Sequence, residues 1–201
     1  AQYGIDEIKS SPIPFDDEYV LINQSDQVKH DIVHIVTQIF QNGEIHILIG
    51  TKSLLGEGWD APAINALILA SFVGSFVLST QMRGRAIRTQ NNNSAKTGNI
   101  WHLVCIDPTS PTGGEDFDLL RRRFRGFVGI SAKEVGGIEN GTGRLNLPDD
   151  LHDEDKIANV NVDTFTRAAN REALNERWNL ALETGVNLVE EIKIPFPEKR
   201  G

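Results

Sequence analysis

Residues 50–62 of this chain read GTKSLLGEGWDAP, and they directly follow the apolar run IHILI at residues 45–49. The glycines of this stretch loosen the backbone too much for regular structure to continue, so the pattern predicts a strand that ends in a loop. Ligands of open α/β sheets bind at the carboxyl ends of the strands. We therefore expect Thr51 to lie at a ligand-binding edge, where Gly56 and Gly58 let the backbone approach a bound group.

A second stretch, residues 81–88, reads QMRGRAIR and contains three arginines. No carboxylate occurs anywhere in residues 79–99. On a helix, Gln81, Arg85 and Arg88 fall on one face, because residues three and four apart are neighbours. One amide and two guanidinium groups without an acid carry too much positive charge for an ordinary core. Such a face is suited to binding phosphate oxygens.

The sequence on either side alternates between strand and helix patterns. Periodicity and capping residues predict strands over 19–23, 45–49, 66–70 and 100–106, a helix that starts at Ser25 and ends at Asn42 and Gly43, and a helix that starts at Ser79 or Thr80 and carries the arginines. Strands that alternate with helices indicate an open α/β sheet with right-handed crossovers.

After Asp107, the regular alternation of strand and helix patterns ends. We predict a turn-rich linker over 108–114, a helix over 117–127 with Phe117, Leu120, Phe124 and Phe127 on one side, a loop over 136–143, a long helix over 164–184, and a strand or tail over 186–194. The chain then divides into an arm or connector at 1–18, an α/β domain at 19–107 and a mainly helical extension at 115–201.

The chain has 201 residues, a net charge of −8 and a single cysteine, Cys105. One cysteine excludes an intrachain disulfide and a cysteine zinc cluster, so we expect a reducing compartment, the cytoplasm, and no metal site built by this chain. No apolar run reaches the roughly 20 residues that span a bilayer, so no membrane is expected as a partner. The N-terminal residues also lack the basic and apolar regions of a signal peptide.

Positive charge is concentrated in two places on this acidic chain. Residues 79–99 and residues 119–133 contain basic side chains and no acid. Local positive faces on an acidic body fit a protein that contacts phosphates at a few points only. The arginines of residues 121–125 form either such a contact or a solvated helix face.

The two stretches at 50–62 and 81–88 together resemble motifs V and VI of superfamily-2 helicases and translocases, in that order. The resemblance implies that residues 19–107 form the second RecA-like domain of such a motor, without a recognisable opening strand and helix. It also implies the role of each residue in the motifs: Arg88 as arginine finger, Arg85 as its partner, Gln81 as a positioning group, Gly58 and Asp60 facing ATP, and Thr51, Lys52 and Ser53 contacting the nucleic-acid backbone.

The residues of the two motifs resemble those of one branch of that superfamily. The pattern Gln-x-x-Gly-Arg-x-x-Arg, after a Glu-Gly-Trp-Asp loop, is similar to motors of the type I and III restriction-enzyme and excision-repair groups. The RNA-acting DEAD-box branch usually begins this motif with His. The resemblance therefore favours double-stranded DNA over RNA as the partner.

Two parts of a complete motor do not occur in this sequence. There is no Gly-x-x-x-x-Gly-Lys-Ser/Thr phosphate loop and no acidic magnesium motif after a strand. We therefore expect an N-terminal RecA-like domain of the same polypeptide to bind ATP and Mg²⁺, and this chain alone to be inactive as an ATPase. The alternative is a non-catalytic helicase-like module that binds nucleic acid or protein. The finger role requires Arg85 and Arg88 to be accessible and not locked to carboxylates far from the ligand edge of the sheet. The alternative for these arginines is a structural role in which they pair with surface carboxylates.

Overall fold

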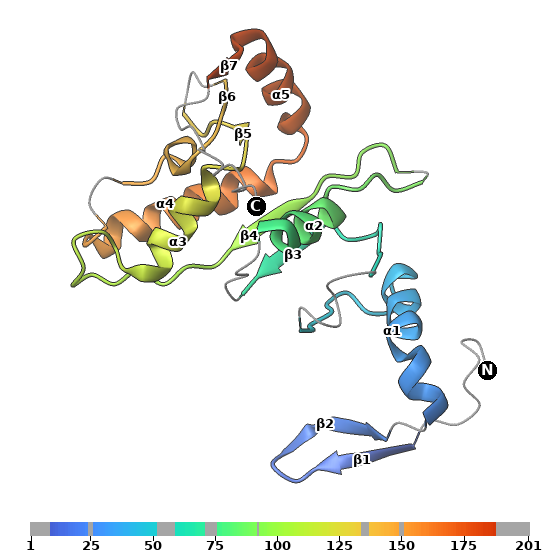
Figure 1. The fold of residues 1–201 in the computed structure, drawn as a ribbon. Coiled ribbons are helices and arrows are strands. Elements are labelled where there is room, and N and C mark those ends of the chain that lie inside the picture. The colour runs from blue at the N-terminus through green and yellow to red at the C-terminus, as the bar shows by residue number, and fades with distance from the viewer. Residues whose placement is uncertain are drawn as a thin grey trace, which may run out of the picture. The chain divides into compact units, whose positions relative to one another are not determined.

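The computed structural model describes residues 9–23, 26–51, 59–70, 76–91, 93–133, 137–148 and 151–187 (Figure 1). The chain forms two compact units, each of which is described by itself. The first unit comprises Ala1–Leu67 and Val77–Ile100, and the second comprises Ile68–Phe76 and Trp101–Gly201.

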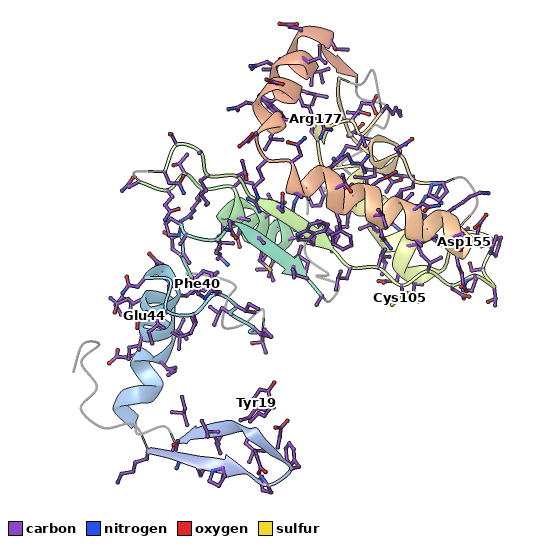
Figure 2. All side chains as sticks on the ribbon, turned by 180° about the vertical axis from the view of Figure 1, so that it is seen from behind. Tyr19, Phe40, Glu44, Cys105, Asp155 and Arg177 are labelled. Atoms are coloured by element: carbon purple, nitrogen blue, oxygen red, sulfur yellow. The ribbon has the colours of Figure 1, made fainter. Side chains whose placement is uncertain are left out.

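The first unit begins with an antiparallel hairpin of β1 (Lys9–Ile13) and β2 (Asp16–Asn23), in which Lys9 lies opposite Asn23. The strand predicted over 19–23 is confirmed and extends back to Asp16. The side chains of β2, including Tyr19 (Figure 2), are exposed to solvent. The strand therefore pairs with the segment before it, and not with a parallel sheet.

The predicted helix after the hairpin is confirmed as α1 (Asp26–Gln41). Its predicted apolar face lies inward, with Ile35 buried and its neighbours on that face half-buried. The helix ends where glycine was expected to end it. Gly43 adopts a φ of 75°, which a residue with a Cβ rarely adopts, and its N–H donates to the Phe40 carbonyl at 3.1 Å.

The strand predicted over residues 45–49 is wrong. These residues have no strand assignment, and Ile47 and Ile49 are 78% and 92% exposed. An apolar run becomes a covered strand only when neighbouring strands pair with it and helices cover it. Within the described residues, no segment pairs with this run.

The arginine stretch begins on α2 (Phe76–Ala86). In the sequence, this helix lies between two strands that pair with each other, β3 (Ala66–Leu69) and β4 (Asn99–His102). The Asn99 N–H donates to the Asn65 carbonyl at 2.9 Å, and the Leu103 N–H donates to the Leu69 carbonyl at 3.3 Å. Both bonds advance in the same direction along the two strands, as they do in a parallel pair. The division between the units passes through β3 and β4.

The predicted strands at 66–70 and 100–106 are confirmed in part by β3 and β4, because β4 ends at His102. The helix between them starts earlier than predicted. It begins at Phe76, and Ser79 is 1% exposed inside the helix and is therefore not its cap. The helix also ends earlier than the motif, because Arg88 lies beyond its last residue, Ala86.

The second unit is built on α3 and a small mixed sheet. Its elements before residue 150 are α3 (Glu115–Phe124), β5 (Gly129–Ile130), β6 (Ile138–Glu139) and the 3-10 helix η1 (Thr142–Leu145). With β7 (Val186–Asn187), the strands form a sheet of order β5-β6-β7, antiparallel between β5 and β6 and parallel between β6 and β7.

The helix predicted over 117–127 is confirmed in part, because α3 ends at Phe124. Three of the four residues of its predicted apolar face are buried, and Leu120 is half-buried. Phe117, Phe124 and Phe127 are 5%, 6% and 4% exposed. The Phe124 ring lies at the centre of this core, with its centroid 5.3 Å from that of His102 and 5.8 Å from that of Phe127. Arg144 of η1 places its guanidinium carbon 5.1 Å from the Phe124 centroid. This aromatic cluster fixes α3 to the rest of the unit.

The single long helix predicted over 164–184 is wrong. Two helices occupy this region, α4 (Glu154–Ala169) and α5 (Ala173–Thr184), separated at Asn170, whose ψ of 75° is not helical. Asn ends helices readily because its side chain bonds to nearby backbone groups, and its Oδ1 accepts from the Ala173 N–H at 3.4 Å. Asp153 caps the start of α4, because its side chain accepts from the Lys156 N–H at 3.0 Å.

The chain is thus mixed α/β, as predicted. Its described strands form two two-stranded sheets and one three-stranded sheet, and no single open parallel sheet occurs among the described residues. The pair β3 and β4 with α2 between them (Figure 1) is the part that follows the predicted alternation. None of the helices in the described ranges is long and apolar enough to cross a bilayer.

Candidate functional site

A small apolar core joins the two sequence stretches within the first unit. Ala61, Ile64 and Ala86 are 0%, 4% and 1% exposed, and partly buried hydrophobic residues pack around them: Phe40 (Figure 2), Trp59, Leu67 and Ile100. Asp60 immediately precedes Ala61, and Arg85 immediately precedes Ala86. The packing of both alanines in one core therefore brings the polar residues of the two stretches to one place.

Asp60 and Arg88 form an ion pair between Oδ1 of the aspartate and Nη1 of the arginine. Both side chains are 50% exposed. Exposed ion pairs contribute only about 0–1 kcal/mol, because water competes for both charges. Arg88 is therefore held in position by Asp60 but can exchange this partner for a more highly charged one at little cost.

Arg85 is close enough to this pair to interact with both charges, and it is only 7% exposed. Burial is the largest cause that lowers its pKa, the charge of Arg88 lowers the pKa further, and Asp60 opposes both effects. The same two residues that form the ion pair thus act on Arg85. We call the three residues the Asp60–Arg85–Arg88 cluster. The cluster contains two guanidinium groups and one carboxylate.

Helix α1 holds the loop that carries Asp60. Gln41 Nε2 donates to the Asp60 carbonyl oxygen at 3.3 Å, and the Trp59 indole N–H donates to Thr37 Oγ1 at 2.7 Å. Thr37 Oγ1 in turn donates to the Val33 carbonyl in the preceding turn of the helix. Sequence reasoning missed Gln41 and Thr37. The available signal was a threonine inside the apolar face of α1.

The backbone after α2 holds Arg88. Its N–H donates to the Arg85 carbonyl at 3.3 Å, and its own carbonyl accepts from Lys96 Nζ. Gly98 lies against the end of the helix, since a Cβ at this position would come within 2.3 Å of the Ala86 carbonyl oxygen. Burial lowers the pKa of Lys96. Lys96 and Gly98 were also missed, because their partners lie far from them in the sequence.

The predicted helix face of residues 81, 85 and 88 does not exist as one surface. Gln81 is exposed, Arg85 is buried, and Arg88 lies past the helix end. Ala86 is buried in one core with Ala61 and Ile64, next to the buried Arg85, and α2 ends at Ala86 before it reaches Arg88.

The loop residues assigned to ligands are described only in part. Thr51 is exposed and has no assigned secondary structure. Lys52, Ser53 and Gly58 lie outside the described residues. Of the loop residues predicted to face the nucleotide, Asp60 alone can be placed, and it lies beside the arginines.

Two glycines near the cluster give a matched pair of stability predictions. Gly98→Ala is expected to lower the free energy of unfolding by roughly 1–3 kcal/mol, because the added methyl group overlaps a backbone carbonyl. Gly84→Ala is expected to raise it by about 0.5–1 kcal/mol, because Gly84 lies in α2 and a Cβ added there would meet nothing within 4 Å. Urea unfolding followed by tryptophan fluorescence measures both changes. Equal effects of the two variants would contradict the close approach at Gly98.

No protein-family model, curated protein or solved structure matches this chain. Among the residues that the structure describes, no group of three or more His, Cys, Asp or Glu side chains is placed to hold a metal ion.

Proposed function

We propose that this chain supplies the arginine-bearing motor lobe of an ATP-dependent DNA helicase or translocase. The lobe is RecA-like in this proposal, and β3, α2 and β4 are its central strand–helix–strand unit. The observation that carries the proposal is the ion pair of Arg88 with Asp60. It brings the glycine-rich loop and the arginine stretch together, as a shared ligand between them requires.

Arg88 is the finger in this mechanism. Its guanidinium is half-exposed and held by one weak ion pair, so an incoming γ-phosphate with several negative oxygens can take the place of Asp60. Arginine fingers raise phosphoryl-transfer rates by roughly 10³–10⁵ by stabilising charge in the transition state. The smaller value already corresponds to about 4 kcal/mol, which exceeds what an exposed ion pair contributes.

The other residues of the site take supporting roles in the proposal. Arg85 repels Arg88, which favours movement of Arg88 toward an anion. Asp60, once released, is an acceptor for a sugar hydroxyl or for a water in the phosphate network. Gln81 is exposed at the surface of α2 and is proposed to position the reacting groups. Gly58 is proposed to let the loop approach the nucleotide.

The cluster does not fit a magnesium site. Mg²⁺ in nucleotide enzymes is bound through one or two carboxylates and the phosphates. The single carboxylate of the cluster, Asp60, is paired with Arg88, and both arginines repel a cation. We therefore assign ATP binding and Mg²⁺ mainly to an N-terminal RecA-like domain of the same polypeptide, in the cytoplasm.

The nucleic-acid contact is proposed for the start of the glycine-rich loop. Thr51 is exposed at the end of the 45–49 run, and Lys52 and Ser53 follow it directly. A hydroxyl, an ammonium and a second hydroxyl are donors that bind backbone phosphates without reading bases. We propose double-stranded DNA as the partner, on the sequence resemblance described above.

The proposal predicts that catalysis needs both lobes. The 201-residue chain alone is expected to show no DNA-stimulated ATP turnover above background, whereas a polypeptide that also carries the phosphate-loop lobe is expected to hydrolyse ATP faster when duplex DNA is added. A coupled phosphate-release assay measures both. DNA-stimulated turnover by the isolated chain, or none by the two-lobe polypeptide, would contradict the proposal.

One observation favours a second function, a helicase-like binding module without catalysis. Arg85 is 7% exposed, so only one of the two proposed catalytic arginines is accessible. The reading frame upstream of this sequence separates the two functions. A phosphate loop and an Asp-Glu motif within roughly 250 residues, the upper size of a typical domain, favour the motor, and their absence favours the module.

A further inference from the structure

Helix α3 of the second unit presents two chemically opposite faces. Its aromatic side chains Phe117 and Phe124 are buried, while Arg121, Arg122 and Arg125 are exposed. Positions 121, 122 and 125 are spaced by one, three and four residues, so they share the outward face of the helix. We call these three residues the α3 arginine face.

Four carbonyl groups at the C-terminal end of α3 are bonded by donors other than arginine side chains. Arginine side chains near a helix C-terminus often satisfy its last carbonyl groups. Here those carbonyls accept from other donors: Arg121 O from the Arg125 N–H at 3.3 Å, Arg123 O from the Gly126 N–H at 3.0 Å, Phe124 O from the N–H groups of Phe127 at 3.0 Å and Gly141 at 2.8 Å, and Arg125 O from Asn140 Nδ2 at 2.9 Å.

The helix dipole also does not explain the whole face. Glu115, Asp116 and Asp118 lie in the first turn, where the dipole favours acids. Arg121 has a carboxylate partner in Asp118, but at 3.9 Å, the outer limit of an ion pair. The dipole effect is about 0.3–1 kcal/mol and falls off within the last turn. One or two cations would suffice for it, whereas the last turn of α3 and its C-cap position contain four arginines, at positions 121, 122, 123 and 125.

We propose that the α3 arginine face binds the phosphodiester backbone of duplex DNA, as a contact separate from the Asp60–Arg85–Arg88 cluster. Planar guanidinium groups bind phosphate oxygens through paired hydrogen bonds, and a helix holds them at fixed spacing. Because phosphate contacts carry no sequence information, this contact is independent of base sequence.

A membrane surface fits the same face less well. Helices that bind anionic lipids insert an apolar face into the headgroup region. The apolar face of α3 is already used, since Phe117 and Phe124 are 5% and 6% exposed in the aromatic core. An acidic protein segment shares the charge of DNA, and the experiment below distinguishes it.

The test is a salt titration of DNA binding by the full 201-residue chain. Fluorescence anisotropy with a labelled duplex of mixed sequence measures binding for wild type, for Arg121→Gln/Arg122→Gln, and for the control Lys156→Gln/Arg171→Gln. The control removes the same charge from exposed positions of the same unit outside α3. Circular dichroism confirms that all three fold.

Each phosphate contact contributes about 0.9 to the slope of log affinity against log salt concentration. The α3 variant is therefore expected to lose roughly 1.8 from the slope relative to wild type, and the control less than half of that. Arg121→Lys/Arg122→Lys keeps the charge and is expected to retain the slope, which also provides a folded variant should the glutamine variant not fold.

Equal slopes in the α3 variant and the control would overturn the proposal. So would an α3 variant that binds DNA as wild type does but loses binding to poly-glutamate or to phosphatidylserine vesicles. No nucleotide is present in this experiment, so its outcome does not depend on whether the chain belongs to an ATP-driven motor.

Discussion

Arg88→Ala is expected to lower ATP turnover by roughly 10³–10⁵-fold in a polypeptide that also carries the phosphate-loop lobe. The side chain is half-exposed, and its ion pair with Asp60 is of the exposed kind. Loss of this pair therefore costs the fold no more than about 1 kcal/mol, while the proposed transition-state contact is lost entirely. Steady-state phosphate release measures turnover, and a fluorescent ATP analogue measures binding, which is expected to stay within a few-fold of wild type.

Two further variants test whether turnover needs the guanidinium group of Arg88 or only a positive charge. Arg88→Lys keeps one positive charge but loses the planar fork, and we expect it to recover only a small part of the rate. Arg171→Ala removes an exposed arginine at the junction of α4 and α5 and is expected to leave turnover unchanged. If Arg88→Ala retains more than a tenth of the wild-type rate, the assignment of Arg88 as the finger is wrong.

Periodicity in the sequence correctly predicted the helices whose buried residues lie close together in the sequence. The apolar face of α1 and the glycine that ends it follow from residues that lie within one helix. The aromatic face of α3 is a similar case, because Phe117 and Phe124 lie on one side of the helix and Phe127 follows three residues after its end. In both helices, the same spacing that indicates the helix also decides which residues are buried.

Elements that depend on distant partners were predicted less well. The run at 45–49 has the composition of a covered strand, but a strand forms only where another pairs with it, and Ile49 is 92% exposed. The break between α4 and α5 at Asn170 was missed because apolar residues continue through it at helical spacing. Asn is a weak helix former, so tertiary packing decides whether a helix continues through it.

In the candidate site too, the sequence motifs predicted some features, whereas features that depend on distant residues were missed. Sequence motifs indicated that Asp60 and Arg88 serve one ligand, and the structure places the two side chains in contact. The burial of Arg85 could not be predicted, because its neighbour Ala86 packs in a core with residues far from it in the sequence, Ala61 and Ile64. The supports at Gln41 and Lys96 act through single bonds to carbonyl groups of distant residues, and no periodicity indicates such bonds.

The largest stability effect is expected for Phe124→Ala in the second unit. Phe124 is 6% exposed, its ring contacts those of His102 and Phe127, and the Arg144 guanidinium lies 5.1 Å from its centroid. Truncating a buried phenylalanine to alanine costs about 3–5 kcal/mol, through lost apolar burial and the cavity that remains. Urea unfolding followed by the fluorescence of Trp101 and Trp178 measures the change.

Arg144 is the reason to expect the upper half of that range. Burial lowers the pKa of Arg144, Glu139 opposes this effect, and its Nε is buried with no hydrogen-bond partner in the described part of the chain. The Phe124 ring stabilises that guanidinium by about 0.5–2 kcal/mol, which the alanine variant also loses. Phe165→Ala is the matched control, since Phe165 is 62% exposed and contacts one ring, Trp101, at 5.1 Å. It is expected to cost about 1 kcal/mol or less. Similar costs for the two variants would show that α3 is not fixed to its unit by the aromatic core, and the rigid spacing required of the α3 arginine face would then lose its basis.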